Sequence, residues 1–348
     1  MILRIGLNRA DRIPVRDSYY PRVSIIVAAR NEEEFIGKCI QSLLKIDYST
    51  ESLEIIVVND GSTDRTAEII GSTVMGHPHV KLLSSTPGTC DLKGKANALE
   101  QGIAQSSGEI LMFTDADCIV QPSWVKETVK YFTPDVGVVG GFTILEAHRT
   151  FEGIQTLDWL FLFSLAAATV SWNKPLTVIG NNLSMTKKAY QKTGGYKTIP
   201  FSVTEDYAIV QAMLTRTKYG VRFPMNPHST IVSKACQSFS HLYRQKQRWG
   251  VGGIDMVPLG FLIMALGWVA KIAFIVSLFY LSFIQWLPLL VLMALGEMLF
   301  ISKPMIRFRE GRILKYFPVF FVYFFSYVII IPFIAFFSKH ILWKERML

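Results

Sequence analysis

Two carboxylates one residue apart, Asp115 and Asp117, directly follow an apolar run over residues 110–113. The run has the composition of a buried strand, and ligands of open α/β sheets bind beyond the carboxyl ends of the strands. At positions i and i+2 of an extended segment, the two side chains are expected to point to the same side. Such a pair of hard oxygen ligands suits Mg²⁺ or Mn²⁺ already chelated by a diphosphate. An acidic turn after a strand has the same composition, so the pair alone does not decide the chemistry.

The composition is that of a basic protein with long apolar segments. Half of the 348 residues are hydrophobic and the net charge is +9. The mean hydropathy of +0.31 is high for a purely soluble enzyme, and the apolar excess lies almost entirely after Pro258. These properties suit an anionic lipid surface, and no basic stripe with interleaved aromatic residues points to a nucleic-acid partner.

The cysteines are scattered and form no Cys-x-x-Cys pair, which favours reduced thiols in a cytosolic domain over a disulfide scaffold or a zinc site. They are Cys39, Cys90, Cys118 and Cys236. Residues 1–21 form a basic segment without the apolar core of a secretory signal. Its few apolar residues fit either a short interfacial anchor or the end of a preceding span.

Strand-like and helix-like segments alternate through the first part of the chain. Strands are predicted at 23–27, 54–58, 80–83 and 109–113, with helices between them. This order predicts an α/β fold with a mostly parallel sheet covered on both faces. Asn31 is predicted to cap the first of these helices, with Glu32 and Glu33 in its first turn.

The middle of the chain continues this domain. Residues 136–141 predict a further strand, and residues 239–249 predict a strongly basic amphipathic helix. Residues 151–172 form a long apolar and aromatic helix candidate, which either packs in the core or lies in the membrane surface.

Three apolar segments follow, at 259–283, 284–301 and 317–338, and each is a candidate membrane span. We expect the first two to form a hairpin with its connection near Trp286, and the third to bend at Pro332. The segment before the third span is basic, which places it in the cytoplasm with the catalytic domain. Lys339, Lys344 and Arg346 then fall on the far side, against the positive-inside rule. Either the third span is re-entrant, or a span precedes the chain, or the rule fails.

Several motifs, in the order of the chain, carry a family resemblance. They are residues 23–27 with Arg30-Asn31-Glu32, then 59–64, Gly94-Lys95, Asp115-Ala116-Asp117, and the pair Thr204-Glu205-Asp206 and Gln245-Lys246-Gln247-Arg248-Trp249. Over residues 22–250 the chain resembles a family 2 glycosyltransferase of the Rossmann-like GT-A fold. The last two motifs resemble the TED and QxxRW motifs of its membrane-embedded members, such as cellulose, hyaluronan and ceramide-glucoside synthases. Asn59 departs from the family, which more often has Asp there.

The resemblance implies a donor site. Asp60 would recognise the uridine alongside Ala29 and Asn31, and Lys95 would meet the phosphates of the donor. Asp117 would hold Mg²⁺ or Mn²⁺, and Asp115 would contact the ribose, the sugar or the metal. Locally, Asp60 also fits a turn cap, and Lys95 fits a solvated lysine at a helix start. A cation at a helix N-terminus opposes the helix dipole, however, so a compensating anion is expected beside Lys95.

An acceptor site is implied in the same way. Asp206 is the candidate general base, because direct attack by an acceptor hydroxyl needs one carboxylate nearby, and Glu205 would orient it or form a neighbouring salt bridge. By itself, Asp206 would be an acid in the first turn of a helix capped by Thr204. Asn181 and Asn182 are candidate sugar or acceptor contacts.

The QxxRW motif has two readings. The resemblance implies that Gln245 and Arg248 hold the diphosphate and that Trp249 stacks beneath the acceptor. The spacing i, i+3 and i+4 places these three on one helix face. The alternative is an interfacial belt in which Lys246 snorkels towards the headgroups.

Together these features predict three parts: the basic segment 1–21, a catalytic domain over 22–250, and a membrane domain over 251–348. The predicted function is metal-dependent, inverting transfer of a hexose from a UDP-sugar to a lipid or lipid-linked acceptor. The protein would be a multi-pass protein of the inner (plasma) membrane with a cytoplasmic catalytic domain. Alternatives are a processive polysaccharide synthase subunit and a catalytically silent nucleotide-sugar-binding scaffold.

Overall fold

A computed structural model of the chain describes residues 2–88, 92–253, 256–337, 342–343 and 346–347. It divides into two compact units. The sheet unit contains residues 5–144 and 166–234, and the helical unit contains residues 145–165 and those from 235 on, with the first four residues. The first helix, α1 (Ile2–Ala10), therefore begins in one unit and continues into the other.

The sheet unit is built on a seven-stranded sheet in the order β3-β2-β1-β4-β8-β6-β9. Its strands are β1 (Val23–Ala29), β2 (Leu53–Asn59), β3 (Val80–Ser84), β4 (Ile110–Asp115), β6 (Val136–Gly140), β8 (Leu183–Thr186) and β9 (Gly220–Arg222). The first four are parallel, as are β6 and β9, whereas β8 runs antiparallel to both of its neighbours. The predicted strands are confirmed, and the mostly parallel sheet becomes mixed at β8.

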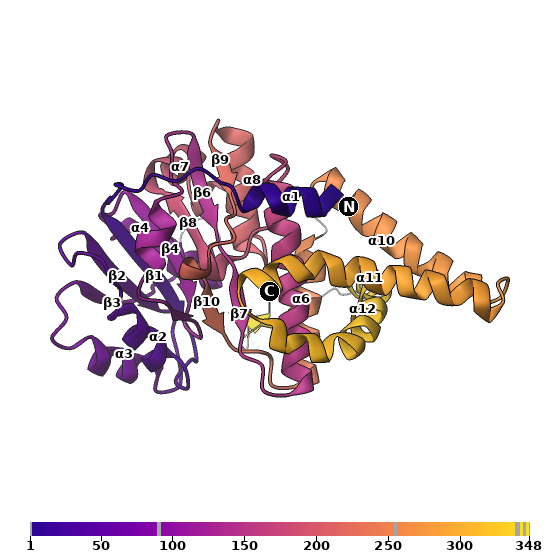
Figure 1. Cartoon of the computed structure of the whole chain (residues 1–348). Coiled ribbons are helices and arrows are strands. Elements are labelled where there is room, and N and C mark those ends of the chain that lie inside the picture. Colours follow the sequence, from indigo (N-terminus) through magenta and orange to yellow (C-terminus); the bar gives the residue numbers. More distant parts are fainter. Residues whose placement is uncertain (1, 89–91, 254–255, 338–341, 344–345, 348) are drawn as a thin grey trace. The chain divides into compact units, whose positions relative to one another are not determined.

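Alternate side chains of the central strands enter two different cores. Ile25 and Ile55 pack with α2, α3 and α5 on one face, whereas Ile26 and Ile56 pack with α4, α7 and α8 on the other. Figure 1 shows α2 and α3 on one side of the sheet and α4 and α7 on the other. The helices are α2 (Ile36–Leu43), α3 (Thr66–Val74), α5 (Trp124–Val129), α4 (Gly94–Ala104), α7 (Lys187–Thr193) and α8 (Glu205–Arg216). Because both faces are covered, the strands are apolar throughout and do not alternate with polar residues.

Short elements complete the sheet unit. A three-stranded sheet has the order β5-β10-β7. Its strands are β5 (Ile119–Val120), β10 (Ile231–Ser233) and β7 (Thr143–Leu145). The 3-10 turns are η1 (Gly180–Asn182), η2 (Tyr196–Thr198) and η3 (Pro227–Ser229). The turn η1 contains the predicted acceptor residues Asn181 and Asn182, and β5 begins two residues after the predicted metal ligand Asp117.

The predicted cap at Asn31 is wrong. Asn31 has φ 51°, in the left-handed region, and α2 begins only at Ile36, with Phe35 at its N-cap. Glu32 and Glu33 therefore lie in a turn before the helix and not in its first turn. The short Asn side chain tolerates this backbone conformation better than most, and here it serves a loop contact described below.

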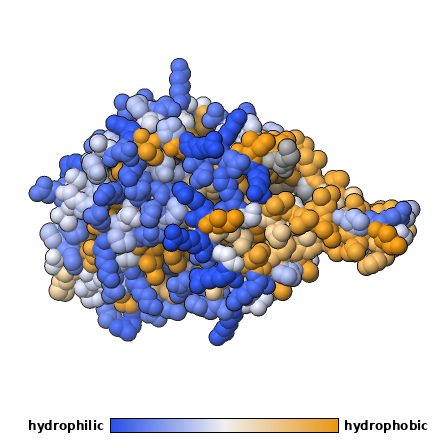
Figure 2. Space-filling model, viewed as in Figure 1, coloured by the Kyte–Doolittle hydropathy of each residue, from blue (hydrophilic) through white to orange (hydrophobic). Residues whose placement is uncertain are grey.

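The helical unit contains most of α6 (Thr150–Val170), followed by α9 (Phe239–Gly252), α10 (Pro258–Ser277), α11 (Phe283–Arg307), η5 (Gly311–Tyr316) and α12 (Phe317–Phe337). Among the described residues, α6, α10, α11 and the segment Gly311–Phe337 are long and apolar enough to cross a membrane. Residues of α10, α11 and α12 are largely exposed, and the surface over α10 and α11 is predominantly hydrophobic in Figure 2.

Helix α6 differs from the other three candidates, because 83% of its apolar window is buried against 17% or less for the others. Within the helical unit, its Phe161 ring lies 5.0 Å from the ring centre of Phe300 and 4.5 Å from that of Phe324. Of the two readings of this segment, the contacts favour core packing.

The connection in the helical hairpin lies earlier than predicted. Helix α10 ends at Ser277 and α11 begins at Phe283, so the turn covers residues 278–282 and Trp286 lies inside α11. Ser282 and Gln285 form a capping box that fixes the start of α11. Helix α12 continues through Pro332. After α12, the described residues form the short antiparallel strands β11 (Leu342–Trp343) and β12 (Arg346–Met347). Lys339 and Lys344 lie outside the described residues.

One ion pair joins the apolar helices. Lys271 of α10 and Glu297 of α11 form a 2.7 Å contact, and the Lys271 ammonium lies 5.2 Å and 5.1 Å from the ring centres of Phe324 and Phe325 of α12. Charges inside an apolar bundle are costly unless they are paired. This contact therefore links all three exposed apolar helices.

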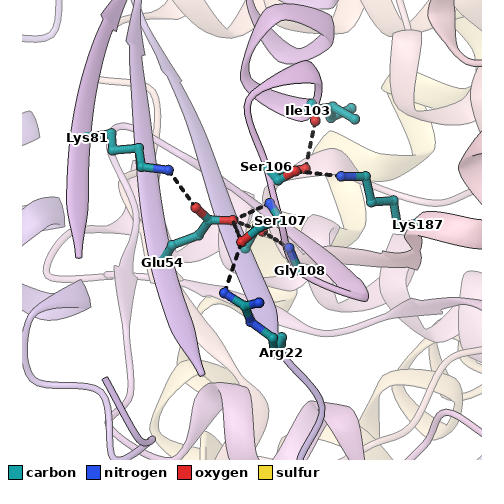
Figure 3. Close-up of polar contacts among 9 residues, drawn as sticks. Arg22, Glu54, Lys81, Ile103, Ser106, Ser107, Gly108 and Lys187 are labelled. Atoms are coloured by element: carbon teal, nitrogen blue, oxygen red, sulfur yellow. Dashed lines mark hydrogen bonds and ion pairs between the residues drawn. The ribbon is translucent and has the colours of Figure 1, made fainter. Parts of the chain in front are cut away.

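A polar cluster at the amino edge of the sheet centres on Glu54 (Figure 3). Its carboxylate accepts hydrogen bonds from the Ser24 hydroxyl (2.6 Å), from the backbone and hydroxyl of Ser107, and from Lys81 (3.0 Å). Gly108 approaches so closely that an added Cβ would lie 2.5 Å from the Ser24 nitrogen. The cluster thus ties the starts of β1, β2 and β4 together.

Burial favours a high pKa for Glu54, but these hydrogen bonds outweigh it and hold the pKa at about 2, against an ordinary 4.5. A lowered pKa stabilises the fold above pH 4.5, and this stabilisation is lost as the pH falls towards 2.

We expect Glu54→Gln to destabilise the sheet unit at pH 7 by about 3 kcal/mol. Unfolding midpoints across this pH range should show the wild-type advantage shrinking with acidity. The variant Glu68→Gln, in an exposed pair with Arg65, should leave the unfolding midpoint close to that of the wild type. An equal effect of both variants would contradict this account.

Candidate active site

The carboxyl ends of three neighbouring strands bring the predicted donor residues together. In the β1–β2 register Ala29 lies opposite Asn59, and in the β1–β4 register Ala28 lies opposite Asp115. Asp60 follows Asn59 directly, and its backbone N–H donates to the carbonyl of Ala29 over 2.8 Å. Residues far apart in sequence therefore meet at one edge of the sheet, as the strand order requires.

The loops after β1 and β2 are fastened to each other. The Asn31 side-chain oxygen accepts from the Thr63 N–H (2.9 Å), and the Asn31 N–H donates to the Ser62 hydroxyl (3.2 Å). Arg30 donates to the carbonyl oxygens of Asp60 and Gly61. The Asn31 amide oxygen is thus committed to a contact between loops, and this structural use of Asn31 had no signal in the sequence beyond its position after a strand.

Asp60 is buried at this edge, with 6% of its surface exposed. Its Oδ1 accepts a 2.8 Å hydrogen bond from the hydroxyl of Ser85, which is the residue that follows β3. Ser85 is a positioning contact that the sequence analysis missed, because only the β2–β3 pairing brings it to this edge.

Asp115 and Asp117 lie at the end of β4, but the geometry between them is not the predicted one. Asp115 is the last residue of the strand, and Ala116 and Asp117 form a turn in which the Cys118 N–H donates to the Asp115 carbonyl over 3.1 Å. The premise that both belong to an extended segment is therefore wrong. Both side chains are partly exposed, and Asp117 lies 3.5 Å from the hydroxyl of Ser233 in β10.

Two buried thiols lie under this turn. Cys39 donates to the carbonyl of Asp115 (3.6 Å) and Cys118 to Asp117 Oδ1 (3.5 Å). Burial, reinforced by the neighbouring carboxylates, raises the pKa of both thiols above its ordinary value. They are therefore neutral packing groups, in agreement with the expectation of reduced thiols; Cys90 lies outside the described residues.

Lys95, in the first turn of α4, lies between two carboxylates. Its ammonium is 2.6 Å from Asp115 Oδ1 and 3.2 Å from Glu205 Oε1. Burial disfavours its charge, but Asp115 and Glu205 outweigh this and raise the pKa of Lys95, so the group is charged at neutral pH. The compensating anions expected near this helix start are thus carboxylates of the protein itself, and Glu205 makes the salt bridge anticipated for it.

Asp206 is positioned by the loop before β8. Its Oδ2 accepts a hydrogen bond from the Gly180 N–H (2.5 Å) and its Oδ1 from the Tyr207 N–H (2.8 Å). A Cβ at Gly180 would lie 3.1 Å from Oδ2, so a larger residue would push this carboxylate away. Thr204 occupies the N-cap position of α8 without a capping side-chain hydrogen bond. Asp206 therefore shares the Lys95–Glu205 end of the site and is held by backbone donors.

The two asparagines of η1 are core residues. The Asn182 oxygen accepts from the Trp124 indole N–H (3.0 Å), and its amide donates to the carbonyls of Phe142 and Ser229. Asn182 is 2% exposed and the hydrogen bonds of its side chain are used inside the protein, so the predicted ligand contact gains no support from the structure. Asn181 is equally buried and accepts from the Thr143 hydroxyl.

The remaining predicted residues lie in the helical unit. Gln245, Arg248 and Trp249 belong to α9, and the Trp249 ring centre is 5.7 Å from that of Trp159 in α6. Lys246 does not snorkel, because it is buried in an ion pair with Asp158. The structure therefore assembles Asp60, Asp115, Lys95, Glu205 and Asp206 in the sheet unit and the QxxRW side chains in the helical unit.

With this geometry established, comparison with known proteins identifies the family. The model of Glycosyl transferase family 2 matches residues 24–203. The chain belongs to this family. The match ends before α9, so it says nothing of the QxxRW branch.

Curated relatives are similar over about 70% of the chain. The probable glycosyltransferase YdaM of Bacillus subtilis is 28% identical over 249 residues, covering 70% of this chain and 57% of its own length. The beta-monoglucosyldiacylglycerol synthase of Synechocystis is 27% identical, with 67% and 48% covered. The poly-beta-1,6-N-acetyl-D-glucosamine synthase of Staphylococcus epidermidis is 28% identical, with 72% and 59% covered. The chain thus spans about half to three-fifths of the length of these relatives.

Among solved structures, the mannosyltransferase PcManGT from Pyrobaculum calidifontis, in complex with GDP-Man and Mn²⁺, matches with a TM-score of 0.63. The match covers 97% of this chain and 95% of that one at 21% sequence identity. The fold is therefore a Rossmann-like GT-A domain with C-terminal helices apolar enough to span a membrane.

The structural role of Asn182 gives a direct test. Asn182→Ala leaves the Trp124 indole N–H and two carbonyls without this partner, and we expect a loss of about 2–4 kcal/mol in unfolding free energy. Unfolding experiments in detergent measure this loss. The control is Gln105→Ala, which removes an exposed amide at the end of α4 and should change the unfolding free energy by less than about 0.5 kcal/mol. A stable Asn182→Ala protein that has lost only substrate binding would return Asn182 to the ligand site.

Proposed function

We propose that this glycosyltransferase transfers a hexose from a UDP-sugar to a lipid or lipid-linked acceptor, with inversion, at the cytoplasmic face of the cell membrane. The observation that carries the proposal is the Asp115–Lys95–Glu205 chain, which ends beside Asp206. In this proposal, Asp115 at the strand end would face the donor, and the nearby Asp206 would activate the acceptor.

The donor half of the site uses the joined loops after β1 and β2. Asp60 and Ala29 would contact the uridine, with Asp60 held by Ser85. Asn31 would contribute through the loop that it fixes. A donor diphosphate beside Lys95 would compete with Asp115 for the ammonium, and the lysine would follow the phosphates. GDP-mannose, the ligand of the structural relative, is the competing donor class to test.

The donor set at the end of β4 fits a hard divalent cation. Asp115 and Asp117 offer carboxylate oxygens, the ligands that Mg²⁺ and Mn²⁺ prefer. Among the described residues no group of three or more His, Cys, Asp or Glu side chains could hold a metal. Two carboxylates alone are a sparse site, so Asp117 and Asp115 would hold the cation together with the donor diphosphate. When bound, the metal neutralises charge on the leaving nucleoside diphosphate.

The transfer itself needs one base. The acceptor hydroxyl oxygen forms a bond to the anomeric carbon, the bond from that carbon to the diphosphate oxygen breaks, and the hydroxyl proton passes to Asp206. UDP leaves with the electron pair. A single displacement of this kind inverts the anomeric configuration. The Gly180 and Tyr207 N–H groups keep the Asp206 carboxylate in one orientation for this step.

The acceptor is proposed from the membrane helices and the relatives. Helices α10, α11 and α12 present apolar surface suited to a bilayer, and one relative is named for the synthesis of a glucosyl-diacylglycerol. A subunit of a polysaccharide synthase remains the second candidate, supported by the poly-N-acetylglucosamine synthase similarity.

The test is UDP release by the purified protein in nanodiscs, with a panel of UDP-sugars and GDP-mannose, with and without total host lipid. We expect release that needs lipid, produces a labelled extractable glycolipid, stops with EDTA and returns with Mn²⁺ or Mg²⁺. Release without added lipid, yielding a long polymer, would support the synthase. Saturable UDP binding without turnover would support a catalytically silent scaffold.

The role of Asp206 has its own prediction. Asp206→Asn keeps the size of the side chain but removes its basicity, and we expect kcat to fall about 10²–10⁴-fold. The affinity for UDP, measured by calorimetry, should change by less than about twofold because the donor side is untouched. Asp47→Asn, on an exposed side chain in the loop between α2 and β2, is the matched control and should retain full kcat. An Asp206→Asn enzyme with nearly normal kcat would remove Asp206 as the base.

A further inference from the structure

The QxxRW helix carries a buried charge that the proposed function does not use. Lys246 of α9 and Asp158 of α6 form an ion pair, and they are only 5% and 4% exposed. Its neighbour Arg244 is exposed, as expected for a basic helix near a membrane. Burying an ion pair costs about as much as its attraction returns, so stability alone gives no reason to keep it.

The pair lies where three helices of the helical unit converge. Tyr323 of α12 donates its hydroxyl proton to Asp158 Oδ2 over 3.4 Å, and the Lys246 ammonium lies 4.6 Å from the Tyr327 ring centre. One turn earlier in α6, the Gln155 amide exchanges hydrogen bonds with the backbone N–H and carbonyl of Cys236 (2.8 and 3.1 Å), just before α9. Helix α9 is therefore fixed by directional polar contacts as well as by apolar packing.

The same pair determines the surroundings of Trp249. The Lys246 ammonium is 4.6 Å from the Trp249 ring centre, a cation–π contact. The indole also packs against Trp159, the residue next to Asp158, with ring centres 5.7 Å apart. Asp158 thus holds the ammonium that contacts Trp249, and the adjoining residue packs against the same ring.

We propose that Asp158 and Lys246 are positioning residues that orient the Trp249 indole for the transfer reaction. This inference rests on the proposed function and on the role that the family resemblance implies for Trp249, stacking beneath the acceptor. Neither residue touches the reacting atoms; each acts through Trp249. An apolar pair of similar volume would fill the same space but would leave the ring without its ammonium contact.

The test separates orientation from stability. Lys246→Met leaves the Asp158 carboxylate buried without its cation, and Asp158→Asn leaves the ammonium without its anion, so both single variants should lower the unfolding temperature. The double variant Asp158→Asn with Lys246→Met removes both charges and retains an acceptor for Tyr323, so its unfolding temperature should return to that of the wild type. Arg244→Gln is the control on the same helix.

Two readouts follow Trp249 in these proteins. The chain has 7 tryptophans, so ¹⁹F NMR of 5-fluorotryptophan-labelled protein in nanodiscs, assigned with Trp249→Phe, reports on this ring directly. We expect the Trp249 resonance to move by more than its linewidth in Lys246→Met and in the double variant, and to stay in place in Arg244→Gln. The KM for the acceptor should rise about five- to tenfold in the double variant, whereas the KM for the donor should change by less than about twofold. The single variant Lys246→Arg keeps a cation beside Asp158 and should have the acceptor KM of the wild type.

A double variant with wild-type stability, resonance and acceptor KM would overturn the proposal, because the pair would then be only structural. If the wild type itself shows no turnover, the proposed function fails, and the ¹⁹F resonance still decides whether Lys246 and Asp158 orient Trp249.

Discussion

The ammonium of Lys95 lies between two carboxylates that come from distant parts of the chain, and much of the site follows from this contact. Asp115 ends β4, Glu205 begins α8, and Lys95 is in the first turn of α4. Without the cation, the partly exposed Asp115 and the buried Glu205 would repel each other. The lysine therefore joins the strand that carries the first acid of the Asp-Ala-Asp turn to the helix that carries the candidate base. In the proposed function, a diphosphate beside Lys95 would rearrange these partners and would thereby couple donor binding to the acceptor side.

Polar groups around this contact divide into those that hold the site and those that remain for ligands. Asn31 accepts a hydrogen bond that joins two loops, and Asn182 accepts one from an indole N–H. Ser85 donates a hydrogen bond to Asp60. The physical criterion is satisfaction: a buried amide with all its groups paired has nothing left to offer a substrate. The same criterion separates Lys246, whose charge is matched by Asp158, from Arg244, which is exposed on the same helix.

The helical unit combines two solutions to the cost of charge in apolar surroundings. Lys271 and Glu297 pair across α10 and α11 against aromatic rings of α12, and Lys246 and Asp158 pair across α9 and α6 beside Trp249. Around both pairs, exposed apolar side chains cover α10, α11 and α12. Such a surface needs lipid or another apolar partner, and its internal charges then act over a longer range than they would in water.

The alternation of strands and helices, the family and the long apolar helices could all be predicted from the sequence alone. They follow from local periodicity and from the order of the motifs. The antiparallel direction of β8, the turn at Asp117, and the burial of Asn182 and Lys246 required the folded structure. The surroundings of Asn182, Lys246 and Lys95 depend on which distant group completes a hydrogen bond or an ion pair: Trp124 for Asn182, Asp158 for Lys246, and Glu205 for Lys95. No local pattern encodes such partners, because packing brings together residues that are tens to more than a hundred positions apart.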